Sequence, residues 1–154
     1  MRLILVALML VAVTVATSLS QNPAPAQQPG AADPAHGKQF EQCAKACDDC
    51  ARLCDMCAAH CAKLIAEGKK DHLNTLQTCQ DCAAICSSAS CVVAKQGPFS
   101  DLICTACAEA CKRCGDACEK KSEDPMMKRC AEECRRCEQA CREMLKHAGA
   151  HQPK

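Results

Sequence analysis

Residues 43–61 read CAKACDDCARLCDMCAAHC, so six cysteines follow one another at alternating steps of four and three residues. This alternation is the spacing of positions that share one face of an α-helix packed against other helices. A β-strand would instead place its buried residues at every second position. The stretch therefore predicts a long helix whose buried face carries cysteine where other proteins place leucine or isoleucine.

Three more blocks of cysteines repeat the same alternation of three and four. A further cysteine, Cys91, follows five residues after the second block, which turns it about 140° away from Cys86 at about 100° per residue. We expect Cys91 to point outward and to bind no core metal, while Ala89 and Val93 continue the buried face. The eighteen cysteines that remain are Cys43, Cys47, Cys50, Cys54, Cys57, Cys61, Cys79, Cys82, Cys86, Cys104, Cys107, Cys111, Cys114, Cys118, Cys130, Cys134, Cys137 and Cys141.

The blocks predict four helices near residues 35–67, 71–95, 99–121 and 125–148. Short connections make sequential helices antiparallel. The predicted fold class is all-α, an antiparallel up-down-up-down four-helix bundle with a cysteine-lined core over residues 34–148.

The predicted helix ends carry local signals. Asp33 and Asp124 each precede a proline, which places a capping side chain before a residue suited to the first helical position. Asp71 is expected to cap the second helix. Gly68 is expected to end the first helix in the left-handed conformation that glycine adopts at little cost.

The amino-acid composition excludes several classes of function. The chain of 154 residues has 19 cysteines, two phenylalanines, no tryptophan and no tyrosine, and its 19 Lys+Arg nearly balance 18 Asp+Glu. A neutral chain without aromatic stacking residues is a poor candidate for binding nucleic acid. No Ser/His/Asp arrangement or nucleotide-binding loop is present, so we do not expect an enzyme.

The N-terminus has the layout of a secretory signal. Arg2 precedes fourteen uncharged residues, and small residues follow before position 21. We expect residues 1–20 to be a signal peptide, 21–33 a disordered linker and 149–154 a flexible tail. An uncleaved anchor is the alternative. The expected protein is exported, periplasmic, and without a membrane span after cleavage.

Three roles for the buried thiols compete. Cysteine used only for packing would forfeit about 1–2 kcal/mol per site relative to leucine, more in total than the stability of a typical domain. A disulfide scaffold agrees with export. Within one helix, however, cysteines three or four apart have Cβ atoms about 5–6 Å apart, while a disulfide needs about 3.5–4.5 Å. Bridges between helices stay open as an alternative.

Metal binding is the third role. Thiolates are soft ligands suited to Cu(I), Zn(II) and iron–sulfur clusters. The spacing matches neither ferredoxin pattern, and zinc sites would appear as separate sets of four. One Cu⁺ per thiolate leaves a neutral core, so the eighteen cysteines are predicted to bind multiple Cu(I) ions. A zinc or general heavy-metal buffer remains an alternative.

The runs CAKACDDCARLCDMCAAHC, CAAIC, CTACAEACKRCGDAC and CAEECRRCEQAC resemble the bacterial copper storage proteins over about residues 36–147. The resemblance implies a four-helix bundle, usually a homotetramer, whose cysteines hold many Cu(I) ions inside the bundle. Exported members typically carry a twin-arginine signal, whereas this chain has the single Arg2.

Other residues extend the cysteine face toward its ends. Phe40, Leu64, Met127 and Met144 fall one step beyond the outermost cysteines, as apolar filling or as thioether ligands. His72 lies one heptad before Cys79, at the end where Met126 and Met127 begin the fourth helix, and these groups are candidate reversible copper ligands. We expect the remaining side chains of this kind at the surface: His36, His60, His147, His151 and Met56.

Overall fold

The computed structural model describes residues 34–148, and the helices found there agree with the predicted set. A short 3-10 turn, η1 (Lys70–His72), precedes the second helix. No strand occurs between residues 34 and 148. The helices are α1 (Pro34–Ala66), α2 (Leu73–Ala94), α3 (Ser100–Glu119) and α4 (Pro125–Ala148).

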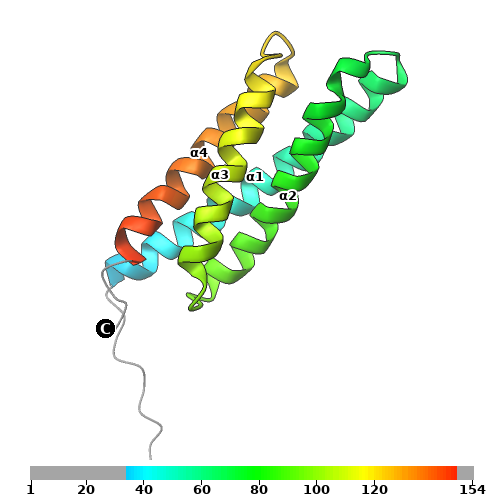
Figure 1. Ribbon diagram of the computed structural model, residues 1–154. Helices are drawn as coiled ribbons and strands as arrows, with labels where there is room; N and C mark the ends of the chain where they lie inside the picture. Colours follow the sequence, from blue (N-terminus) through cyan, green and yellow to red (C-terminus); the bar gives the residue numbers. More distant parts are fainter. Residues whose placement is uncertain (1–33, 149–154) are drawn as a thin grey trace, which may run out of the picture. The chain divides into compact units, whose positions relative to one another are not determined.

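The four helices form the predicted antiparallel bundle (Figure 1). Each helix packs against its neighbours in sequence, and α4 closes the ring against α1. The pairing of sulfur atoms gives the directions. Cys43 of α1 lies beside Cys141 and Cys54 lies beside Cys130, so α1 and α4 run in opposite directions. The all-α up-down-up-down prediction is confirmed.

Two of the predicted signals at the helix ends are confirmed, and one is wrong. Asp124 caps α4, because its Oδ1 accepts the backbone N–H of Met126 at 2.8 Å and that of Met127 at 3.3 Å. Gly68 follows α1 with φ of 94°, as expected of a left-handed residue. The prediction for Asp71 is wrong: it lies in η1, makes no capping bond to α2, and pairs with Lys121 instead.

Ion pairs and hydrogen bonds of Arg135 join α4 to α3 on the outside of the bundle. Arg135 Nε donates to Glu119 at 2.9 Å, its Nη1 donates to the carbonyl of Lys112 at 3.2 Å, and its Nη2 pairs with Asp116. Gly115 makes room for this guanidinium, since a Cβ there would lie 3.1 Å from the Arg135 Cζ atom. Polar contacts on the outer faces therefore add to the stability of a bundle whose core contains few large apolar groups.

No helix among residues 34–148 is long and apolar enough to cross a membrane. The predicted signal peptide at 1–20, the linker at 21–33 and the tail at 149–154 lie outside the described residues, as does Asp33.

Candidate metal centre

Eighteen of the nineteen cysteines are buried, and Cys91 alone is exposed. The helical-wheel prediction for Cys91 is therefore confirmed. Ala89 and Val93 are fully buried and continue the face of α2 in its place. All nineteen thiols are free, and no contact between their sulfur atoms is shorter than 3.5 Å.

The core cysteines form a continuous column of sulfur atoms along the bundle. Helices α1 and α3 lie diagonally across the core and run in the same direction, so four successive cysteines of α1 each meet a cysteine of α3. Their Sγ–Sγ distances are 3.7 Å for Cys43–Cys104, 3.8 Å for Cys47–Cys107, 3.8 Å for Cys50–Cys111 and 3.9 Å for Cys54–Cys114.

Helices α2 and α4 complete the column from the two remaining sides. Cys86 of α2 lies 3.6 Å from Cys107 and 3.5 Å from Cys111, measured between sulfur atoms. Cys137 of α4 lies 3.8 Å from Cys47 and 3.9 Å from Cys107. Every predicted ligand thus lies in one shared core, which the sequence spacing within single helices did not show.

Several sets of four cysteines hold their sulfur atoms within 4.8 Å of one another. Neighbouring sets share members, so a sulfur in one set also belongs to the next. Such sharing permits thiolates to bridge adjacent metal ions. Five of the sets are Cys47, Cys107, Cys137, Cys141; Cys50, Cys82, Cys86, Cys111; Cys50, Cys54, Cys82, Cys134; Cys54, Cys114, Cys130, Cys134; and Cys57, Cys79, Cys118, Cys130.

Burial in the core opposes the ionisation of thiols when no metal is bound. Burial raises the pKa of the Cys61 thiol, and hydrogen bonding with Cys114 raises that of Cys54. The buried polar residues in the described part are His72, Thr75 and Ser100, so no lysine or arginine is available inside to neutralise thiolates. A cation that enters this core must displace protons from the thiols and supply the positive charge itself.

The end of the bundle formed by the η1 and α3–α4 connections carries further soft or basic groups, and we call it the Met127 end. The Met127 sulfur is fully buried and lies 3.5 Å from the Cys57 sulfur and 4.0 Å from that of Cys61. His72 is 9% exposed, and its buried Nδ1 has no hydrogen-bond partner in the described structure. Met126 is half-buried.

His60 and Asp124 also meet at the Met127 end, a contact that sequence reasoning missed. His60 Nε2 lies 2.7 Å from Asp124 Oδ2, and the histidine is part-exposed. Burial alone would raise the pKa of Asp124, but the bonds from His60 and from two backbone N–H groups lower it overall. Nothing in the spacing of residues 60 and 124 signals this pairing, since they are brought together only by the packing of α1 against α4.

The opposite end, which we call the Met144 end, is apolar. Phe40, Val93 and Met144 are buried there in the same core cluster as the cysteines. The outermost core thiols at this end are those of Cys43, Cys104 and Cys141. The column of sulfur atoms therefore ends against hydrocarbon and one thioether.

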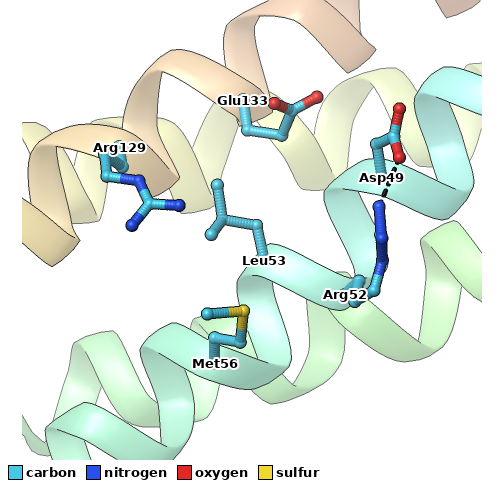
Figure 2. A pocket seen from close by; sticks show the side chains of 6 residues that line it. All are labelled: Asp49, Arg52, Leu53, Met56, Arg129 and Glu133. Carbon is cyan, nitrogen blue, oxygen red and sulfur yellow. Dashed lines mark hydrogen bonds and ion pairs between the residues drawn. The ribbon is translucent and has the colours of Figure 1, made fainter.

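A surface hollow of about 240 Å³ lies between α1 and α4 (Figure 2). Asp49 and Arg52 pair beside it, and Glu133 and Arg129 reach toward it from α4. Met56 lines it and is 47% exposed, as predicted for a residue off the cysteine face. No cysteine lines this hollow, so it is separate from the core. The side chains of His36, His147 and His151 lie outside the described set.

The profile of the family described as copper storage protein matches residues 36–146. A solved structure titled as copper loading to a cytosolic copper storage protein from Streptomyces lividans shares 28% identity, with a TM-score of 0.68, over 74% of this chain and 98% of that one. The Cu(I)-bound copper storage protein BsCsp3 shares 31% identity, with a TM-score of 0.63, over 70% of this chain and 98% of its own.

A third solved structure, the Streptomyces lividans protein Ccsp loaded with 10 copper equivalents, shares 30% identity over 71% of this chain and 85% of that chain, with a TM-score of 0.65. No protein with a curated description matches the chain.

These comparisons correct the predicted localisation. The expectation of an exported, periplasmic protein is wrong by this comparison, because the solved Streptomyces lividans structure is that of a cytosolic copper storage protein.

Proposed function

Because the chain belongs to the copper storage protein family, we propose that it binds and stores many Cu(I) ions inside its four-helix bundle, through the thiolates of the eighteen core cysteines. The observation that carries this proposal is the continuous column of buried sulfur atoms, with neighbours at 3.5–4.0 Å along the bundle. Copper is the cargo of the protein, and storage requires no catalytic group.

The chemistry of loading follows from charge. Each Cu⁺ that binds replaces a thiol proton, so one ion per thiolate leaves the buried core neutral. Soft sulfur ligands suit Cu(I), and the low water content of the core protects the bound ion from exchange. The sharing of cysteines between neighbouring sets of four supports bridging thiolates and therefore a dense copper content.

The Met127 end is the proposed place of copper uptake. The contacts of Met127 with Cys57 and Cys61 would pass an ion from a thioether to thiolates, and the unpartnered Nδ1 of His72 is a further donor at the same end. Neutral imidazole and thioether bind copper more reversibly than thiolate does. The apolar Met144 end offers no comparable nitrogen donor among its described side chains.

A homo-oligomer, tetrameric by family resemblance, is the proposed assembly. Phe99 and Leu102 at the start of α3 are 67% and 68% exposed, so these two apolar side chains are available for contact with another chain. Sedimentation equilibrium of the metal-free and copper-loaded protein tests this, with four chains per particle expected and a monomer contradicting it.

Anaerobic titration of the reduced protein with Cu(I), against a chelator that competes for copper, tests the storage function. We expect saturation at nine ions or more per chain, one for every two of the eighteen core cysteines. A thiol count under denaturant should give about nineteen free thiols. Saturation well below nine ions would contradict storage, and a count near one thiol would instead support the disulfide alternative.

A parallel titration with Zn(II) separates copper storage from a general heavy-metal buffer. The copper capacity should clearly exceed the zinc capacity, because each divalent ion needs more thiolates and leaves an unneutralised charge in the core. Equal capacity and equal competition strength for both ions would favour the buffer.

A further inference from the structure

Three of the five named four-cysteine sets have no cysteine in common, and two of these three draw their ligands from only three helices. The Cys50 site consists of Cys50 from α1, Cys82 and Cys86 from α2, and Cys111 from α3. The Cys47 site consists of Cys47 from α1, Cys107 from α3, and Cys137 and Cys141 from α4. Both sites lie fully inside the bundle.

In both sites, four of the six sulfur–sulfur distances are close to the separation that a tetrahedral metal requires, and the other two are below 4.8 Å. Tetrahedral zinc binds thiolate at about 2.3 Å, which places the four sulfur atoms about 3.8 Å apart. In the Cys50 site, the sulfur of Cys111 lies 3.8 Å from that of Cys50, 3.9 Å from that of Cys82 and 3.5 Å from that of Cys86, and Cys82 lies 3.8 Å from Cys86.

The Cys47 site has the same dimensions. The sulfur of Cys47 lies 3.8 Å from that of Cys107, 3.8 Å from that of Cys137 and 3.6 Å from that of Cys141, and Cys107 lies 3.9 Å from Cys137. A metal ion would therefore need only small adjustments of the cysteine side chains to bind at either site. The bundle supplies the ligand geometry that a zinc finger obtains only by folding around its metal.

We propose that the copper-free protein binds divalent ions that prefer tetrahedral thiolate ligands, of which Zn(II) is the biological example, in the Cys50 and Cys47 sites. The proposal rests on the proposed function only in using the same core thiols. It adds a second class of cargo, held at two defined positions and not along the whole column.

The charge of the core limits both the affinity for divalent ions and the number that bind per chain. Four thiolates around one divalent ion carry a net charge of −2, and no lysine or arginine is buried in the described core. Cu⁺ matches the thiolates one for one, so copper should displace the divalent ion. The bundle would then hold a small divalent load until Cu(I) replaces it, and each replacement would release the divalent ion.

Anaerobic titration of the reduced, metal-free full chain with Co(II) tests the proposal. Co(II) takes the same tetrahedral thiolate geometry as Zn(II) and absorbs visible light when it does. We expect the absorption of tetrahedral Co(II) thiolate to saturate at two or more ions per chain. Addition of Zn(II) to one sample, and of Cu(I) to another, should abolish this absorption. Absence of that absorption, or saturation below two ions, would overturn the proposal.

Matched serine variants locate the ions. Cys86→Ser and Cys137→Ser should each lower the saturation by one Co(II) per chain, while Cys91→Ser, an exposed cysteine on the same helix as Cys86, should leave it unchanged. Equal losses from Cys86→Ser and Cys91→Ser would overturn the assignment. Far-ultraviolet circular dichroism confirms that each variant is helical.

The copper capacity of the same preparations separates the two proposals. Normal Cu(I) loading without Co(II) binding would overturn only the divalent sites. Co(II) binding without Cu(I) loading would contradict copper storage and leave the divalent sites supported.

Discussion

The two ends of the bundle close the same column of thiols with different chemistry. At the Met127 end, a thioether lies 3.5 Å from Cys57, and a buried imidazole nitrogen has no partner in the described structure. At the Met144 end, Phe40 and Val93 cover the last cysteines with hydrocarbon. Both ends are buried, so burial alone does not distinguish them. Each end carries a buried thioether, and the difference lies in the contacts of the Met127 sulfur with two core thiols and in the buried nitrogen of His72.

From this comparison we infer that the Met144 end contributes mainly to stability and that the Met127 end is the place of metal exchange. Apolar burial at the Met144 end contributes free energy of folding to a bundle whose core is otherwise made of small side chains. The donors at the Met127 end are also buried, and by our proposal they provide groups from which copper passes to the thiolates. Four predictions test this division.

The largest expected effect is on stability at the Met144 end. Phe40→Ala should lower the free energy of unfolding of the metal-free protein by about 3–5 kcal/mol, because it removes a large buried side chain and leaves a cavity. Urea denaturation followed by circular dichroism measures this change. Phe40→Leu serves as the control and should recover most of the loss. Copper capacity should be unaffected, and a marked fall in that capacity would contradict a purely apolar role for this end.

The thiols should make the metal-free protein sensitive to alkali. The folded pKa of Cys61 is raised above its ordinary value of 9.0, so its contribution to stability is fully present below pH 9 and is lost as the pH rises toward the raised value. We expect the melting temperature of the metal-free protein to fall above pH 9 and that of the copper-loaded protein to be higher and less dependent on pH. A metal-free melting temperature that rises above pH 9 would contradict this sign.

A matched pair of substitutions compares the ends directly in their handling of copper. Met127→Leu and Met144→Leu each conserve volume, so each should cost less than about 1.5 kcal/mol of stability. Stopped-flow measurement of Cu(I) uptake should show several-fold slower loading for Met127→Leu and no change for Met144→Leu. Equal rates in the two variants would remove the functional difference between the ends.

The smallest effect concerns the cap of α4. Asp124→Ala should lower stability by about 1 kcal/mol, because the N–H groups of Met126 and Met127 lose their acceptor. The same change removes the partner of His60. Asp124→Asn retains a capping oxygen and should recover most of the loss in thermal denaturation. A loss above about 3 kcal/mol would show that the contact between His60 and Asp124, and not the cap, is the larger contribution.

Periodicity predicted most of the fold because each helix repeats one buried residue type. The steps of three and four determined which cysteines face inward, and the five-residue step to Cys91 identified the exposed one. The prediction for Asp71 was wrong because the sequence does not reveal the short 3-10 turn before α2. That turn moves Asp71 away from the N-terminal end of the helix. Its carboxylate pairs with Lys121, which is distant in sequence.

Spacing along one helix could not show which thiols of different helices meet. The sets of four depend on the vertical register between helices, and that register follows from connection lengths and packing. The position of the Arg135 guanidinium over Gly115 depends on the same register. The apolar N-terminal run predicted export, and the comparison with a cytosolic copper storage protein from Streptomyces lividans contradicts that prediction.

Copper capacity in two single variants tests the central claim most directly, that copper binds to the thiols inside the bundle. Anaerobic Cu(I) titration of Cys86→Ser, Cys91→Ser and the unaltered protein gives the number of ions bound per chain. The account predicts that Cys86→Ser, which removes a buried sulfur 3.5 Å from that of Cys111, lowers the capacity, and that Cys91→Ser leaves it unchanged. Equal losses from the two variants, or no loss from Cys86→Ser, would contradict it.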